Sequence, residues 1–201
     1  MSRTLHRLRA AGLRLRHGLP LRGGISGLIC NDHYVSHVSI HLTAAQWAEE
    51  ADVLEVGARG GDGLDELRRH CAPSSLRGLE ADPRLVRSAR RRFGLDLGVT
   101  SLDALPGDEP PADLLLAVNI LQQLADPDRT LDWMAAHGRP GARAVVSVPP
   151  VVDEMTMAAH RAIPECRSHR FIWEWELAVR RRFDRITIYR QVCVEHSTVH
   201  R

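Results

Sequence analysis

The chain has 201 residues, of which 44% are hydrophobic and 26% charged, and its formal net charge is +2. These values predict a globular protein with one main core. They exclude a membrane-spanning protein, because no apolar run approaches the roughly 18 residues that a membrane helix needs. The near-neutral charge balance disfavours a nucleic-acid partner for the chain as a whole. The sequence contains no lysine, so Schiff-base chemistry and a P-loop are also excluded.

The four cysteines are scattered and include no C-x-x-C pair. This distribution indicates reduced thiols, and it disfavours a disulfide framework or a zinc site. We therefore expect a cytoplasmic protein.

Arginine is concentrated at the amino end. Residues 1–31 contain six arginines and no acidic residue, with leucines between them at loosely helical spacing. A targeting presequence, a membrane-surface or RNA-binding arm, and a solvated helix that packs its leucines on the domain all fit this pattern. Because Gly23-Gly24 follows, we divide the chain into a basic amphipathic extension, residues 1–24, and a single domain, residues 25–201.

The sequence predicts helices ahead of the first strand, and after it strands and helices alternate. Residues 31–41 are expected to be helical, and Thr43 to Gln46 form a capping box that opens a short helix to about residue 50. After the first strand, later helices begin at Asp82-Pro83 and Asp126-Pro127, where aspartate caps the helix and proline occupies its first turn. A last helix covers residues 172–182. Strands are predicted over residues 52–56, 76–80, 98–101, 113–118 and 142–148, and near 186–189 and 192–195. This alternation predicts an α/β protein with a doubly wound sheet.

Acidic residues follow the first three strands of the predicted sheet. The first strand ends at Glu55 and a glycine-rich turn, the second ends at Glu80, and Asp103 follows the third. Ligands of such sheets bind beyond the carboxyl ends of the strands, where glycine lets backbone approach them closely. An acid that ends the second strand can accept both hydroxyls of a ribose, and an acid after the third can accept from an adenine amine. A carboxylate rim favours a positively charged nucleoside over a triphosphate.

In order and spacing, these motifs resemble those of class I S-adenosylmethionine-dependent methyltransferases. The resemblance covers about residues 50–195. It implies a Rossmann-like sheet of seven strands, mostly parallel with an antiparallel strand near the carboxyl terminus. It also implies lid helices in residues 25–50, a cofactor-binding half in 51–150, and an acceptor loop with the final helix and strands in 151–201. The motifs are Glu55 to Gly63, Gly78 to Pro83, Asp103 to Pro106, Ala117 to Pro127 and Arg139 to Pro149.

The resemblance further implies which residues hold S-adenosylmethionine. Glu55 and the glycine turn would hold the methionine part, Glu80 the ribose and Asp103 the adenine amine, with Asn119 beneath the sulfonium. The full predicted set is Glu55, Gly57, Ala58, Arg59, Gly61, Glu80, Ala81, Asp103, Ala104 and Asn119.

Two positions depart from the pattern of the family. Arg59 replaces the middle glycine of the turn, where it either obstructs the methionine tail or pairs with its carboxylate. A dinucleotide-binding loop would need glycines at positions 59 and 62, so the departure does not favour that alternative. Gln122-Gln123 stands where many relatives have Glu-His, which removes a general base.

Methyl transfer depends mainly on in-line positioning, and a base is needed only for a hydroxyl or a protonated amine. We name His169, Asp153 and His37 as candidate catalytic residues, with Glu154 and His160 in the same acceptor segment. His33, His37 and His41 are spaced by four, so a helix would place them on one face. A lid over the cofactor and a surface stripe both fit this row. No carboxylate partner is evident in the sequence, so no metal is predicted.

The predicted activity is methyl transfer to oxygen or nitrogen, in preference to carbon, of a small molecule such as a secondary metabolite or a sugar. Methylation of nucleic-acid bases is disfavoured, because the Asn-Pro-Pro-Tyr turn and the Pro-Cys nucleophile of those enzymes are absent. One alternative is a protein that binds the cofactor but catalyses cyclisation, elimination or nothing. Another is an RNA-associated methyltransferase that uses residues 1–24. A homodimer is one option for the assembly.

Overall fold

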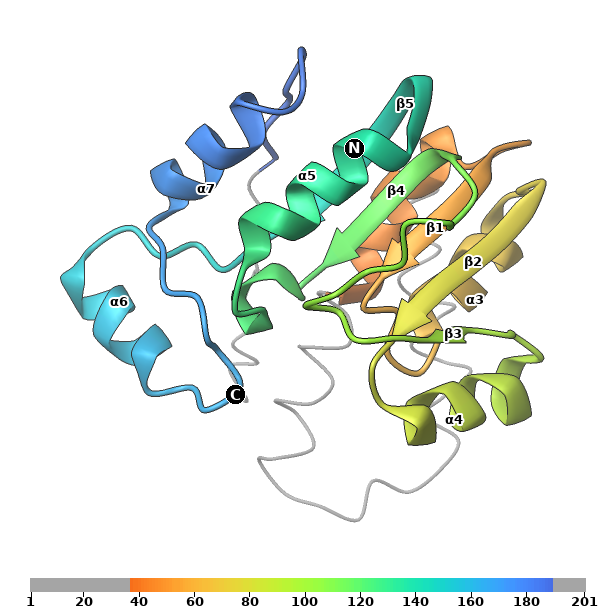
Figure 1. Ribbon diagram of the computed structural model, residues 1–201, viewed down its shortest axis with the longest axis horizontal. Helices are drawn as coiled ribbons and strands as arrows, with labels where there is room; N and C mark the ends of the chain where they lie inside the picture. The colour runs from red at the N-terminus through yellow and green to blue at the C-terminus, as the bar shows by residue number, and fades with distance from the viewer. Residues whose placement is uncertain (1–36, 190–201) are drawn as a thin grey trace, which may run out of the picture. The chain divides into compact units, whose positions relative to one another are not determined.

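The structure is a computed structural model that describes residues 37–189 (Figure 1). In this part of the chain, five strands form one sheet in the order β3-β2-β1-β4-β5, and every neighbouring pair is parallel. The strands are β1 (Asp52–Val56), β2 (Ser75–Glu80), β3 (Gly98–Val99), β4 (Ala112–Val118) and β5 (Gly138–Ser147). The helices are α3 (Asp62–His70), α4 (Pro83–Phe93), α5 (Pro127–His137), α6 (Glu154–Arg161) and α7 (Ile172–Arg180), with short turns η1 (Ala45–Trp47) and η2 (Leu121–Gln123).

The sheet is covered on both faces, as its continuous apolar strands predict. In β4, Leu114 and Leu116 pack in a core with residues of α3 and α4, whereas Leu115 and Ala117 pack in a second core with residues of α5 and α7. This alternation follows from the two-residue period of a strand. The strand order reverses between β1 and β4, so the crevice beyond their carboxyl ends is the expected ligand site. The doubly wound α/β prediction is confirmed.

The two Asp-Pro helix starts are confirmed. Asp82 caps α4 by accepting a hydrogen bond from the backbone N–H of Arg84 at 2.7 Å, and Asp126 caps α5 by accepting one from that of Arg129 at 3.1 Å. In both helices proline occupies the first turn, where its missing N–H removes no helical hydrogen bond.

The prediction of a capping box at Thr43 to Gln46 is wrong. The helix that covers residues 37–44 continues through Thr43, whose hydroxyl donates to the carbonyl of Ser39 at 2.9 Å. The buried side chains of Ala44 and Ala48 continue the packed face of this segment, so packing decides over the local capping signal.

The carboxyl end also differs from the prediction. Residues 186–189 form no strand, and the side chains of Ile188 and Tyr189 are exposed. The described residues contain five strands, all parallel, so seven strands with an antiparallel one are not confirmed. Residues 1–24, residues 25–36 of the predicted lid segment, and the predicted strand at 192–195 lie outside the described residues. None of the helices in residues 37–189 has the length and apolar character needed to cross a bilayer.

We expect Asp82→Ala to destabilise the fold by about 1 kcal/mol, because it removes the side-chain acceptor at the start of α4. Chemical denaturation measures this change in the free energy of unfolding. Asp96→Ala, at an exposed position, is the matched control and should change it by less than about 0.5 kcal/mol. Equal effects of the two substitutions would contradict the capping role.

Candidate functional site

Glu80, the last residue of β2, ties the end of its strand to the turn that follows β1. Its side chain is buried, and its Oε2 accepts a hydrogen bond from the backbone N–H of Arg59 at 2.8 Å. Its Oε1 accepts from the backbone N–H groups of Ala81 at 2.8 Å and Asp82 at 2.9 Å. Because each carboxylate oxygen has two lone pairs, Oε2 keeps acceptor capacity for a ligand hydroxyl.

The turn after β1 is built from left-handed backbone conformations. Gly57 and Gly61 have φ values of 74° and 76°, and Arg59 between them has a φ of 52°. Such values are uncommon outside glycine and concentrate at functional sites. The hydrogen bond from the Arg59 N–H to Glu80 holds this conformation, and the arginine side chain is exposed. The turn therefore forms with arginine at its centre.

The remaining predicted cofactor residues lie along the same edge of the sheet. Ala58 is buried in the turn, whereas Ala81 and Ala104 are exposed just after β2 and β3. Gly57 packs closely against the Ile120 side chain, since a Cβ at position 57 would lie only 2.4 Å from it. Close packing within the protein therefore favours glycine at this position.

Glu55 in β1 forms a buried pair with His41. The two side chains are 1% and 0% exposed, and Glu55 Oε1 lies 2.8 Å from His41 Nε2. His41 Nδ1 lies 3.0 Å from the carbonyl oxygen of His37. Since both ring nitrogens face oxygen acceptors, the ring is an imidazolium that donates twice. The other oxygen, Glu55 Oε2, is buried and has no hydrogen-bond partner among residues 37–189.

Helix α3 leaves room for this pair at Gly63. A Cβ at that position would lie 2.1 Å from His41 Nε2, so any larger residue would displace the imidazole. Burial lowers the pKa of His41, but the charge and hydrogen bond of Glu55 outweigh it, with contributions from the His37 carbonyl and the Glu66 charge. The pKa of His41 is therefore raised above its ordinary value.

His37, His41 and Glu55 each offer a ligand atom, and these atoms lie within 4.8 Å of one another. The expectation that the histidine row has no carboxylate partner is therefore wrong. The surface-stripe interpretation is also wrong for His37 and His41, which are buried with ring centroids 4.7 Å apart. A doubly donating His41 has no lone pair for a metal ion, so we interpret the group as a hydrogen-bonded ion pair. His33 lies outside the described residues.

Asp103 connects two neighbouring segments. Its Oδ1 accepts from the backbone N–H of Ala125 at 2.9 Å, and its Oδ2 accepts from the Arg167 guanidinium at 2.7 Å. Partial burial raises the pKa of Asp103, but these two donors outweigh it and lower the pKa overall. The residue predicted to bind the adenine amine thus keeps a negative charge.

Asn119 directly follows β4 in a left-handed conformation, with a φ of 52°. Its N–H donates to the Ser147 hydroxyl at 2.9 Å, and that hydroxyl donates to its Oδ1 at 3.0 Å. Gln122 and Gln123 donate to its carbonyl oxygen, both at 3.1 Å. The glutamine pair therefore helps to fix the residue that follows β4.

The structure pairs His169, a predicted catalytic residue, with His160 of α6. Their Nδ1 atoms are 3.1 Å apart. Burial and the neighbouring His169 lower the pKa of His160, whose Nε2 is buried without a hydrogen-bond partner in the described part of the chain. From the sequence, His160 was only one of several candidate residues of the acceptor segment. Nothing in the sequence signals that it contacts His169.

The other two catalytic candidates have structural roles here. Asp153 caps α6, where its Oδ1 accepts from the backbone N–H of Thr156 at 2.8 Å, and these contacts with Thr156 lower its pKa. A lowered pKa makes it a weaker base. His37 is buried, with its ring against that of His41.

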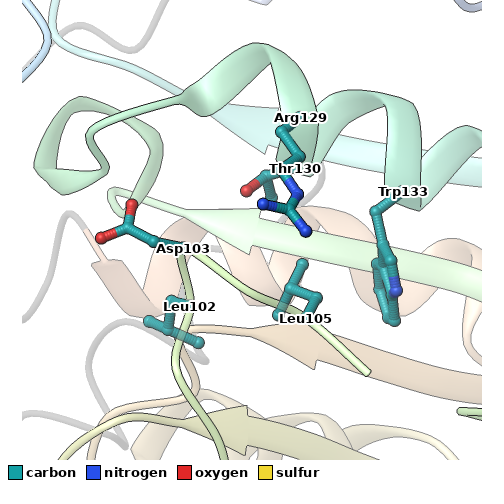
Figure 2. A pocket seen from close by; sticks show the side chains of 6 residues that line it. All are labelled: Leu102, Asp103, Leu105, Arg129, Thr130 and Trp133. Atoms are coloured by element: carbon teal, nitrogen blue, oxygen red, sulfur yellow. The ribbon is translucent and has the colours of Figure 1, made fainter. Parts of the chain in front are cut away.

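A small pocket lies between the segment after β3 and helix α5 (Figure 2). Figure 2 shows the Asp103 carboxylate turned away from Trp133, whose Nε1 donates to the Pro106 carbonyl at 2.7 Å. The pocket shares only Asp103 with the predicted cofactor residues, so it is not the expected crevice. Its lining residues are Leu102, Asp103, Leu105, Arg129, Thr130 and Trp133.

The model of a family described as a methyltransferase domain matches residues 32–191. The chain belongs to this methyltransferase family. The resemblance to class I S-adenosylmethionine-dependent methyltransferases is confirmed, and S-adenosylmethionine is the corresponding cofactor.

Two curated relatives match part of this methyltransferase domain. Trans-aconitate 2-methyltransferase of Methylobacterium nodulans is 29% identical over 121 residues, 60% of this chain and 45% of that protein. An uncharacterised 37.1 kDa protein in transposon TN4556 of Streptomyces fradiae is 27% identical over 127 residues, 61% and 37% of the two chains. The match thus spans less than half the length of these relatives.

Solved structures share the fold. A chain from the complex of the Haloferax volcanii Trm112 methyltransferase activator with a methyltransferase has a TM-score of 0.62 at 24% identity, over 75% of this chain and 71% of that one. CalS10, a S-adenosylmethionine-bound amino pentose methyltransferase from Micromonospora echinaspora, has a TM-score of 0.52 at 20% identity, over 64% and 57%. The [4+2]-cyclase SpnF has a TM-score of 0.57 at 17% identity, over 72% and 56%. At these identities the likeness concerns the fold alone.

We expect the His41–Glu55 pair to make stability depend on pH. A histidine with a raised pKa adds stability that is fully present below its unfolded pKa, about 6.5, and is lost as pH rises through the folded value. Thermal unfolding from pH 5 to 9 measures the effect as the difference in melting temperature between wild type and His41→Phe. The difference should be largest at acidic pH and shrink above the raised pKa. A difference that does not vary with pH would contradict the ion pair.

Proposed function

We propose that this domain is a S-adenosylmethionine-dependent methyltransferase that acts on oxygen or nitrogen of a small molecule. The observation that carries the proposal is the pair of buried carboxylates, Glu55 and Glu80, on either side of the left-handed turn at the end of β1. Two buried acids at the carboxyl end of the sheet suit a cationic nucleoside and oppose an anionic one.

The residues present fit the cofactor. Glu55 Oε2, buried without a partner among the described residues, suits the α-ammonium group, and Glu80 Oε2 has acceptor capacity for a ribose hydroxyl. Asp103 would accept from the adenine amine, with Asn119 beneath the sulfonium. When bound, the cofactor supplies a methyl group already activated on a cationic sulfur. The chain's own task is to bind and orient the donor and the acceptor.

The acceptor side would be formed by the segment from β5 to α7, with His169 as the base for a hydroxyl acceptor. His169 Nδ1 lies 3.1 Å from His160 Nδ1. In the base-competent tautomer His169 Nδ1 donates its proton to His160 Nδ1, which leaves the lone pair on His169 Nε2. His169 Nε2 would then accept the proton of the acceptor. The relatives named for trans-aconitate and amino pentose methylation support a small acceptor.

A second candidate function is a reaction other than methyl transfer on the same fold. It is supported by the likeness to the [4+2]-cyclase SpnF and by Gln122-Gln123, which replaces the Glu-His of many relatives.

An RNA-associated role would use residues 1–24, outside the described part of the chain. Deleting them and comparing RNA affinity at several salt concentrations tests that role, and an unchanged affinity would end it.

We expect wild-type protein to bind S-adenosylmethionine, and Glu80→Gln to weaken binding by about tenfold or more. The reason is that an amide loses the charge and directs N–H groups toward the donors of the turn. Calorimetry measures the affinity, and the melting temperature of each variant controls for folding. Asp108→Asn, at an exposed acid after β3, is the matched control. A melting temperature of wild type that saturating cofactor leaves unmoved would refute the proposed function.

Turnover separates methyl transfer from the second candidate. Incubation with a panel of small hydroxyl and amine acceptors should release S-adenosylhomocysteine, detected by mass spectrometry. With a hydroxyl acceptor, we expect His169→Asn to lower kcat by about 10²-fold or more and to leave cofactor affinity unchanged. His70→Asn, at the end of α3, is the control. Product formed without S-adenosylhomocysteine would favour the cyclase-type alternative, and an unchanged kcat would exclude His169 as the base.

A further inference from the structure

We propose that His41 is a positioning residue that holds the Glu55 carboxylate so that Oε2 receives the α-ammonium group of the cofactor. The inference rests on the proposed function. It assigns a role in cofactor recognition to the helix over residues 37–44, which lies ahead of the first strand.

The geometry of the contact fixes both partners. His41 Nε2 donates to Glu55 Oε1 at 2.8 Å, and its Nδ1 donates to the His37 carbonyl at 3.0 Å, so neither end of the ring can turn without losing a bond. The ring also lies against Gly63, where a Cβ would be 2.1 Å from Nε2. Helix 37–44, strand β1 and helix α3 thus meet at one imidazole.

Burial opposes the protonated form of His41, but two carboxylate charges and a carbonyl acceptor favour it and outweigh burial. Glu55 faces it from β1, and the Glu66 charge acts on it from α3. His37, on its own helix, supplies the carbonyl acceptor and a ring whose centroid is 4.7 Å away. A carboxylate that is 1% exposed is costly to bury without a cation or donors, and His41 supplies both for Oε1.

Oε2 is the part of the pair that His41 does not satisfy. It is buried and has no hydrogen-bond partner among residues 37–189. Buried carboxylate oxygens are rarely left without a donor, so this atom has the character of a binding position. A primary ammonium group matches it, because it adds positive charge and up to three N–H donors beside the glycine turn. The imidazolium and the ammonium would then share one carboxylate, each on its own oxygen.

The test compares two ligands that differ at the amino-acid tail. S-adenosylhomocysteine carries the ammonium group, whereas 5′-methylthioadenosine keeps the nucleoside and lacks the tail. For His41→Phe we expect calorimetry to show about tenfold weaker binding of S-adenosylhomocysteine and unchanged binding of 5′-methylthioadenosine. His41→Gln, which keeps an N–H donor for Glu55, should recover part of the affinity.

The matched control is His137→Phe. His137 Nδ1 bonds the carbonyl four residues earlier, Trp133, at 2.8 Å, as His41 bonds that of His37, but its helix is α5. The His137→Phe substitution should leave the affinity for both ligands unchanged. If His41→Phe weakens both ligands equally, or neither, His41 has only a structural role and the proposal is overturned.

A measurement on the wild-type protein covers the case in which His41→Phe does not fold. NMR titration of the histidine rings should show the pKa of His41 falling when S-adenosylhomocysteine binds, because a second cation then shares Glu55. 5′-methylthioadenosine should leave it unmoved. An unmoved pKa with bound S-adenosylhomocysteine would overturn the role of His41 alone, whereas failure of wild type to bind either ligand would refute the proposed function itself.

Discussion

Buried carboxylates impose the main constraint at the carboxyl edge of this sheet. A carboxylate removed from water has to be hydrogen-bonded or paired, or the fold loses several kcal/mol. Glu80 meets this requirement with three backbone N–H groups, and Glu55 meets it in part with His41. These donors belong to the turn after β1, to the residues before α4 and to the helix ahead of β1. The two acids therefore determine how three separate segments meet at the site.

The two acids differ in what they leave for a ligand. Both oxygens of Glu80 are already bonded to backbone, so this residue acts as a fixed part of the turn and offers only its remaining lone pairs. Glu55 has one oxygen bonded and the other buried without a partner in the described residues. An additional hydrogen-bond donor is needed to satisfy the Oε2 atom of Glu55. A ligand donor would therefore add a missing hydrogen bond at Glu55, whereas the protein alone already fixes the carboxylate of Glu80.

What the sequence predicted correctly was local. The start of each helix at an Asp-Pro pair and the apolar run of β4 depend on neighbouring residues, and both are confirmed. The strand-end positions of Glu55 and Glu80 followed from the same patterns. Contacts between distant residues were not predictable, since nothing in the spacing of His41 and Glu55, or of Asp103 and Arg167, signals that they meet.

Helix α6 was missed, although Asp153 and Thr156 form the reciprocal cap at its start, which is a local signal.

Two histidines of the proposed site have pKa values shifted in opposite directions by their surroundings. His41 beside Glu55 has a raised pKa, whereas His160, buried beside His169, has a lowered one. The charged form of the same side chain is thus favoured where it faces a carboxylate and disfavoured where it faces another imidazole. In the proposed site this difference suits transfer to a hydroxyl, because a proton acceptor is useful near the acceptor oxygen and not near the methyl donor. If the two environments were exchanged, the proposed base would lie beside the proposed ammonium position and the acceptor hydroxyl would face a cation.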